Sequence, residues 1–419
     1  MSSHADTAHV EPLDLKPYRN VPIIAIVAGA VLMVLGFLAV GGGENGVLQF
    51  GFSWLLAFMF FLSLCLGAFF LTMAHHMFDA SWSVPIRRVT ETLACVAPWM
   101  LVLWIPIGLL ATKIYPWMGP ELQKHPDHAL SSKYPLLTIP GFYVTAAFCF
   151  FVWIVWTWQL RRWSLRQDET GSARCTYRMR VWTGTGIFLF AITLTLGAIM
   201  WIKALMHEWF STMYGVWYFA SSVWTTLATL YVICLILQRA GPLRHVMHEK
   251  QYYFLGSLLF AFTVFYAYIS FAQYFIIWNA NMPEEVFWYN LREVGSWKIV
   301  GRYIIIFGHF FVPFLGLLRI DVKLRPCYMF GLAIWAWVMH FCDLQFQIMP
   351  SLHKDGVSAT GLILDLGCMA FIGGVVALYF TRSYVKHAPY PQKDPRIAEG
   401  LDIYVPPTSY ISTAPDRAK

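Results

Sequence analysis

Charged side chains are scarce in this chain of 419 residues. Asp, Glu, Lys and Arg make up only 13% of it, whereas soluble domains contain about 25% of these residues. Hydrophobic residues reach 58%, and the mean hydropathy is +0.55. This composition excludes an ordinary soluble protein. Ten apolar stretches, each about long enough to cross a bilayer, predict an all-α integral membrane protein with about ten transmembrane helices.

Motifs that would hold a redox centre or a nucleotide are also missing. The eight cysteines form no Cys-x-x-Cys pair, no covalent haem motif and no iron–sulfur spacing. Seven of them lie within or at the edge of apolar stretches, where small hydrophobic packing is their ordinary role. No glycine-rich nucleotide loop or hydrolase triad is present. We therefore expect no catalytic residue and no metal site in this chain, and chemistry either within the membrane or in partner proteins.

Windows of about 20 apolar residues divide the chain into a membrane domain (21–383) between a polar N-terminal tail (1–20) and a polar C-terminal tail (384–419). No small-residue cleavage site follows the first stretch, so we expect it to remain as a helix. The predicted helices lie near residues 22–41, 52–74, 89–112, 138–160, 181–205, 214–238, 252–278, 299–318, 327–349 and 359–381.

The C-terminal tail is rich in proline and too polar to fold alone. We expect it to be extended and to be stabilised, if at all, by a neighbouring subunit. Its apolar residues Ile403, Tyr404 and Val405 indicate either such a contact or simply a loose tail.

Lys and Arg are distributed unevenly between the two sets of connecting loops. The loops on the side of both termini hold fourteen of them, and the opposite loops hold six. By the positive-inside rule, this difference places both termini in the cytoplasm. The net charge of +7 follows mostly from this asymmetry and needs no nucleic-acid partner.

Four ionisable residues interrupt the last three apolar stretches, although a charge in hydrocarbon is costly. His340, Asp343 and Gln347 lie at i, i+3 and i+7, on one face of a helix. His309 lies at a comparable depth in the preceding helix, and Asp365 lies in the outer third of the last one. The four ionisable residues predict a cluster open to the outer side, either a proton half-channel or a set of cofactor ligands. Alternatively, each is satisfied by a neighbouring hydroxyl or carbonyl and only fixes helix packing.

Hydroxyl and amide side chains recur at helical spacing in the sixth and seventh predicted helices. They are suited to carry a hydrogen-bonded water chain across the membrane, or they serve the ordinary close packing of helices. The candidate linking residues are Ser222, Thr226, Thr229, Tyr266, Ser270 and Gln273.

A second ionisable group follows the second predicted helix on the cytoplasmic side. Arg87 and Arg88 lie about one helical turn from Glu91, which indicates an interfacial salt bridge. The His, Asp and Glu side chains together are equally typical of a proton entrance from the cytoplasm. The candidate residues of this inner group are His75, His76, Asp79 and Glu91.

Two connecting segments carry a family resemblance. They are ASWSVPIRR (80–88) and AQYFIIWNANMPEEVFWYNLREVGSW (272–297), the second with a Gln-Tyr run, Trp-Asn-x-Asn, Pro-Glu-Glu and an aromatic pair. These segments resemble those of the F subunit of bacterial alternative complex III. That subunit belongs to the NrfD-like membrane subunits, relatives of the polysulfide reductase anchor. The resemblance extends over nearly the whole chain.

This resemblance implies two four-helix bundles, formed by helices 2–5 and 6–9, with helices 1 and 10 outside them. It implies a subunit of a quinol:cytochrome c oxidoreductase in the bacterial cytoplasmic membrane. The partners would be a sister NrfD-like subunit, an iron–sulfur subunit and c-type cytochromes, with lipids and a terminal oxidase as further neighbours. The sister subunit is the one generally assigned the quinol site.

The function we expect is a proton pathway in a subunit that carries no redox centre. The outer and inner groups would form two half-channels, linked by the hydroxyls of the sixth and seventh helices. A quinone-binding subunit, a non-catalytic scaffold and a b-type cytochrome with His309 and His340 as haem ligands remain alternatives. For quinol oxidation, the outer loop offers His125, Asp127 and His128, which also suit a solvated surface. A free-standing transporter is disfavoured because no pair of Gly/Pro-interrupted helices is visible.

Overall fold

The computed structural model describes residues 19–401. Within this range the chain is helical, and ten helices are long and apolar enough to cross a membrane. The all-α membrane fold is therefore confirmed. The spans are α1 (Val21–Ala39), α2 (Gly43–Met77), α3 (Val84–Ala94) with α4 (Ala97–Ile114), α7 (Ile139–Thr170), α8 (Ala173–Trp201), α9 (Tyr214–Arg239), α10 (Glu249–Ala280), α12 (Trp297–Ile299) with η5 (Val300–Phe311) and α13 (Val312–Leu317), α15 (Pro326–Ile348), and α16 (Ala359–Val385).

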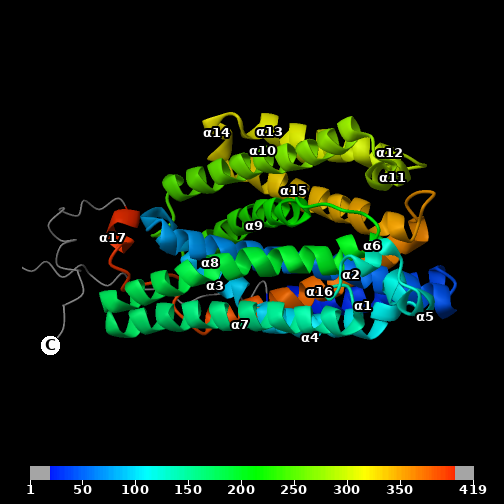
Figure 1. The fold of residues 1–419 in the computed structure, drawn as a ribbon. Helices are drawn as coiled ribbons and strands as arrows, with labels where there is room; N and C mark the ends of the chain where they lie inside the picture. Colours follow the sequence, from blue (N-terminus) through cyan, green and yellow to red (C-terminus); the bar gives the residue numbers. More distant parts are fainter. Residues whose placement is uncertain (1–18, 402–419) are drawn as a thin grey trace, which may run out of the picture.

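Short helices connect the spans at the two ends of the molecule (Figure 1). One end carries η2 (Ser81–Ser83), α14 (Ile320–Lys323) and α17 (Ile397–Gly400). The other carries η3 (Pro116–Met118), α5 (Pro120–Lys124), α6 (His128–Ser131), η4 (Lys203–Met206), α11 (Pro283–Arg292) and η6 (Met349–Ser351). We call the first the basic end, because the arginine-rich loops lie there, and the second the opposite end.

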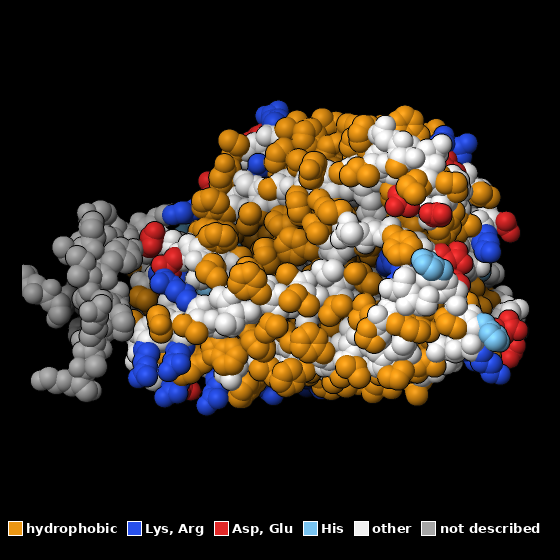
Figure 2. Space-filling model, in the orientation of Figure 1, with side chains coloured by type: hydrophobic (Ala, Val, Ile, Leu, Met, Phe, Trp, Pro, Cys, Tyr) orange, Lys and Arg blue, Asp and Glu red, His pale blue; other side chains and the backbone are white. Residues whose placement is uncertain are grey.

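The ten spans form two bundles with a separate helix pair. The first bundle contains α2, α3 with α4, α7 and α8, and the second contains α9, α10, the η5 span and α15. Helices α1 and α16 lie outside both bundles, pack along each other, and contact α2 through α16. Figure 2 shows hydrophobic side chains over the middle of one face and charged ones towards its ends, as a bilayer requires.

Close packing of α1 on α16 depends on glycines. A Cβ at Gly29 would lie 2.4 Å from the backbone nitrogen of Phe371, and one at Gly367 would lie 2.7 Å from that of Met33. Small residues at such contacts allow two helix backbones to approach, and in lipid this van der Waals packing is a main force between helices. The pair is therefore fixed by shape.

Helix α2 is the axis of the molecule. Nearly all of its side chains are buried, and it packs against α9 in the second bundle as well as α3, α4, α8 and α16. At the contact between the bundles, a Cβ on Gly67 would lie 2.2 Å from Oγ1 of Thr226. The interface between the bundles is therefore tight at mid-helix.

Two spans are irregular in ways that the hydropathy pattern does not predict. The third is broken near Cys95 and Val96, where α3 ends and α4 begins. The eighth is π-helical over Val300–Phe311, and this wider turn ends beside His309. Because π-helical turns are rare and occur often at functional sites, this segment marks the surroundings of His309.

The first part of the C-terminal tail folds back onto this chain. We call residues 386–401 the strap. Its backbone nitrogen at Gln392 donates to Asp168 on α7, and the carbonyl of Gly400 accepts from Gln251 on α10, at 2.9 and 2.8 Å. The expectation that the tail needs a neighbouring subunit is therefore wrong for the strap, which joins the two bundles. Ile403, Tyr404 and Val405 lie outside the described residues.

Candidate functional site

A row of hydrogen-bonded polar side chains leads from the opposite end into the membrane domain along α2. Nε2 of His353 lies 2.6 Å from Oε1 of Gln49, whose amide nitrogen donates to Ser53 Oγ at 3.1 Å. The Ser53 hydroxyl donates in turn to Asp365 at 2.5 Å, and Gln345 donates to the other carboxylate oxygen at 3.0 Å. Burial lowers the pKa of His353, the half-exposed first member. The buried Asp365 carboxylate is thus connected to the molecular surface.

His340 and Asp343 lie deeper, on α15, which packs against α2, α9 and the η5 span. Nε2 of His340 lies 2.9 Å from the Ser63 hydroxyl, which donates at 2.7 Å to the carbonyl of Phe60. Both oxygens of Asp343 are buried and make no hydrogen bond of ordinary geometry within the described part of the chain, although the Tyr266 and Gln347 side chains lie next to them. Because a buried polar group without a partner is costly, the Asp343 carboxyl is a strong candidate for a proton-carrying or water-binding group.

His309 is held between aromatic rings. Its imidazole stacks on Trp224 at 4.1 Å and on Tyr266 at 3.8 Å between ring centroids. Neither ring nitrogen has a hydrogen-bond partner among the described residues. The ring therefore has a fixed orientation and two free nitrogen positions.

The b-type cytochrome alternative would use His309 and His340 as haem ligands, each through a nitrogen in the plane of its ring. Both ring nitrogens of His309 are without a partner among the described residues, whereas Nε2 of His340 lies 2.9 Å from the Ser63 hydroxyl. A haem bound through this Nε2 would have to replace the contact with Ser63.

The predicted outer group therefore divides into two. Asp365 belongs to the chain that starts at His353, whereas His309, His340 and Asp343 lie on the other side of α2, in the second bundle. Among the described residues, no hydrogen bond or ion pair joins Asp365 to the other three. The sequence predicted one cluster, and the structure has two neighbouring ones.

The predicted linking hydroxyls mostly bond to backbone. Ser222 donates to the carbonyl of Tyr218 at 2.6 Å, Thr229 to that of Thr225 at 2.8 Å, and Thr226 to that of Leu64 across the bundle contact at 3.3 Å. These are packing roles. Tyr266 and Ser270 differ, since Tyr266 stacks on His309 and the buried Ser270 hydroxyl has no hydrogen-bond partner within residues 19–401. Gln273 is half-buried further along the same helix.

At the basic end, Glu91 is part of a buried ion-pair network. Its Oε2 lies 3.0 Å from Nη1 of Arg88 and 3.6 Å from Nη1 of Arg161. Arg88 also pairs with Asp168 on α7. Through these contacts Glu91 joins α3 to α7. The salt-bridge interpretation describes this residue.

A second ion-pair network ties the strap over the end of α2. Asp394 pairs with Arg87 and, at 2.8 Å, with Arg396. Arg396 and Arg180 each contact Asp79 at 2.5 Å, and these contacts hold the pKa of Asp79 below its usual range although burial opposes this. Asp79 therefore helps to hold the strap against the basic end of the molecule.

His75 and His76 lie beneath the strap at the end of α2. Both are buried, and none of their four ring nitrogens has a hydrogen-bond partner among the described residues. The His75 ring packs edge-on against Trp82 at 5.2 Å between centroids. Of the predicted inner group, these two histidines and Glu91, through its Oε1, have proton-binding atoms without a partner in the described part of the chain.

The polar groups of both ends lie along one helix. In chain order, α2 contributes Gln49, Ser53, Ser63, His75 and His76. At 1.5 Å per residue, Ser63 and His76 are about 20 Å apart along the axis. In this interval α2 meets α9, and Thr226 of α9 donates to the carbonyl of Leu64.

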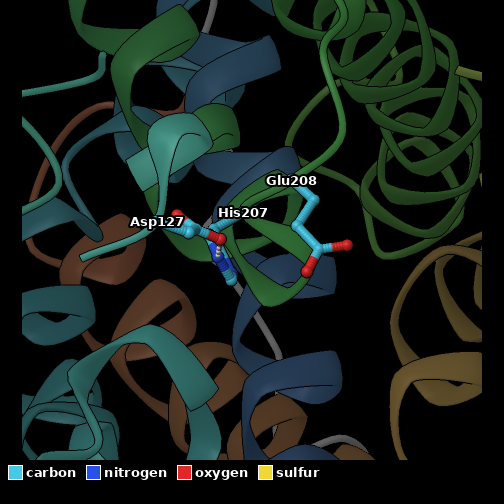
Figure 3. A group of neighbouring side chains, drawn as sticks. All are labelled: Asp127, His207 and Glu208. Carbon is cyan, nitrogen blue, oxygen red and sulfur yellow. Dashed lines mark hydrogen bonds and ion pairs between the residues drawn. The ribbon is translucent and has the colours of Figure 1, made fainter. Parts of the chain in front are cut away.

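The loop residues of the opposite end form a local cluster (Figure 3). Asp127 faces His207 at 3.0 Å and also caps α6 by accepting from the Leu130 nitrogen at 2.7 Å. Glu208 extends beside them and could complete a set of metal ligands. However, Lys133 donates to the carbonyl of His207, and its positive charge acts on Asp127, which opposes the binding of a cation there. We assign this cluster to joining two loops.

Sequence patterns missed several of these residues. Gln49, Ser53 and Ser63 are single polar residues in a long apolar stretch, and Gln345 and His353 flank the end of another. The signal was present in Gln49 and Ser53, which lie at i and i+4 on one face of α2. His125 and His128 lie in the exposed opposite-end loop. Comparison of the chain with protein-family models and with curated proteins finds no match.

Proposed function

We propose that this chain is a non-redox membrane subunit of a quinol-oxidising respiratory complex and that it conducts protons along α2. Proton conduction needs ionisable or hydroxyl groups that reach a buried region from each side. The path from the opposite end is His353, Gln49, Ser53 and Asp365. At the basic end, the corresponding groups are His75 and His76.

The observation that carries this proposal is the continuous contact from half-exposed His353 to buried Asp365. Each of its three steps lies within hydrogen-bond distance. A scaffold would need no connected row of exchangeable protons reaching the surface. The second bundle adds three proton-binding side chains, those of His309, His340 and Asp343. Each has at least one buried nitrogen or carboxylate oxygen without a partner among the described residues.

Membership of a quinol-oxidising complex rests on the resemblance to F subunits of alternative complex III. In the structure, the segment 80–88 forms η2 and the start of α3 beneath the strap. The segment 272–297 contains the end of α10 and all of α11, where Arg292 lies 3.4 Å over the Trp288 ring and donates to the carbonyl of Phe346 at 3.0 Å. Both segments form ends of the membrane domain, which is where neighbouring subunits would bind.

The proposed orientation follows the arginine distribution. It places the basic end and both termini in the cytoplasm of a bacterium, and His353 towards the periplasm. Labelling of a cysteine introduced at Lys354 or at Arg244 with an impermeant thiol reagent tests this. The Lys354 variant should react in intact spheroplasts, and the Arg244 variant only after lysis.

Two experiments test the function. Complex purified through a tag on this chain should contain c-type haem and iron–sulfur subunits, and the isolated chain should show no b-haem band. In proteoliposomes, the double variant His340→Ala with Asp343→Asn should translocate fewer protons per electron while electron transfer continues. An unchanged ratio would remove these two residues from the pathway. Loss of assembly, with normal pumping by residual complex, would favour the scaffold.

A further inference from the structure

A cavity at the basic end lies apart from the polar groups on α2. Its volume is about 540 Å³, in the range of small-molecule sites. It lies between the start of α4, the last four turns of α7 and the end of α16, and it opens on the molecular surface. Its lining residues are Cys95, Pro98, Ile154, Thr157, Trp158, Arg161, Arg162, Leu165, Arg166, Glu169, Tyr379, Ser383 and His387.

The lining changes character along α7. Ile154 and Trp158, within the apolar stretch, line one half, and Arg161, Arg162 and Arg166 line the other. These residues recur every three or four positions, so they share one face of the helix. Because the apolar half lies at the depth of acyl chains and the basic half at the depth of headgroups, the cavity matches an amphipathic ligand standing in the bilayer.

Arg161 is the group that points to a ligand. The residue is only 8% exposed, and its Nη1 donates to Thr92 at 2.8 Å. Its Nη2, in contrast, is buried with no partner among the described residues. Glu91, the nearest carboxylate, is shared with Arg88, so it neutralises Arg161 only in part. A buried guanidinium nitrogen without an acceptor favours an anionic oxygen in the cavity.

Charge balance supports the same class of ligand. Three arginines line the cavity against one carboxylate, that of Glu169. Burial lowers the pKa of His387, and the positive charges of Arg161 and Arg88 lower it further. The His387 ring therefore also lies in a positive environment. Arg162 lies 5.3 Å over the Trp158 ring, a pairing typical of the membrane interface.

We propose that this cavity binds the headgroup of an anionic phospholipid from the adjoining leaflet. The phosphate would contact Arg161 and the two outer arginines, and the acyl chains would lie along Ile154 and Trp158. Basic pockets between helices on the cytoplasmic side are suited to such headgroups. The bound lipid would join α7 of the first bundle to α16 of the outer pair.

The test is lipid titration of the purified full-length chain, read by native mass spectrometry. Phosphatidylglycerol should bind in preference to phosphatidylcholine of the same chain length. The double variant Arg162→Gln with Arg166→Gln should weaken phosphatidylglycerol binding about 10- to 30-fold, since each basic residue near a headgroup contributes roughly a factor of five. Both arginines are exposed, so the variant should fold, and its melting temperature without lipid should be unchanged.

The matched control is Arg174→Gln with Arg244→Gln, which removes the same charge from exposed positions outside the cavity. Its affinity should stay within about twofold of the wild type, because surface charge alone contributes little to a contact site. Equal loss in the control, or equal binding of both lipids, would overturn the proposal. Displacement of phosphatidylglycerol by inorganic phosphate alone, or by a short-chain menaquinone, would also overturn it and assign the cavity to that ligand.

Discussion

Asp394 should decide whether the strap stays closed over the end of α2. The residue is 1% exposed and its carboxylate pairs with the guanidinium groups of Arg87 and Arg396. Asp394→Asn keeps the size of the side chain but leaves both arginines without their shared anion. Removing one partner of a buried ion pair destabilises a protein by about 3–5 kcal/mol. Here we expect this free energy to be lost from the contact between the strap (386–401) and the rest of the protein.

Hydrogen exchange measures this loss directly. Each 1.4 kcal/mol is about a factor of ten in an opening equilibrium, so amide protection in the strap should fall by at least about 100-fold. Protection in α11, which lies at the opposite end of the molecule from α17 (Figure 1), should not change. The control is Lys393→Gln, because Lys393 donates only an exposed hydrogen bond to the carbonyl of Glu169. Unchanged protection of the strap in Asp394→Asn would refute the assignment of this ion pair.

The pH dependence of the strap follows from the same contacts. Burial alone would raise the pKa of Asp394, but Arg87 and Arg396 hold it far below its ordinary value. A carboxylate with a depressed pKa stabilises the folded state fully above the unfolded value of about 3.9 and loses that contribution as the pH falls through the folded pKa. Strap protection should therefore be the same at about pH 8 and about pH 5.

Three further outcomes are expected. Gly29→Ala should lower the melting temperature, because overpacking costs about 1–3 kcal/mol and its Cβ would lie 2.4 Å from the Phe371 backbone; Gly184→Ala, which meets nothing within 4 Å, is the control and should have little effect. Lys203→Met should raise the melting temperature below about pH 7 and less at higher pH, since burial, with Lys133 adding to it, lowers the pKa of Lys203 to about 7. His353→Gln should flatten the loss of stability below about pH 6.5, because burial lowers the pKa of His353 and the unfolded chain then takes up the proton first. For Gly29→Ala, Lys203→Met or His353→Gln, a melting curve equal to that of the wild type over the stated pH range would contradict the corresponding prediction.

The membrane fold was predictable because it depends on average hydropathy over long windows. All ten spans have the predicted type, and the break at Cys95 and the π-helical turns before His309 escaped because they depend on local packing. The strap escaped for a different reason. Its composition is that of a loose tail, and only the spatial arrangement of Arg87 with Asp394, 307 positions apart, stabilises it.

The sequence pattern identified most candidate residues one by one, but it did not predict which of them lie together in the structure. Ionisable residues in apolar stretches are conspicuous, so His340, Asp343 and Asp365 stood out. Their partners are ordinary serines and glutamines on α2, whose helix is so apolar that single polar residues look incidental. The hydroxyls of Ser222 and Thr229 donate to the carbonyls of their own helix, and their role as a link between the two ends stays a prediction.

Proton translocation per electron, measured in proteoliposomes containing the complex with Asp365→Asn, tests the α2 pathway most directly. Asp365 is joined to the surface through Ser53 and cannot exchange a proton as an amide. The ratio should fall by at least about half, Asp365→Glu should restore it in part, and Thr145→Val on α7 should leave it at the wild-type value. A wild-type ratio in an intact Asp365→Asn complex would contradict proton conduction along α2.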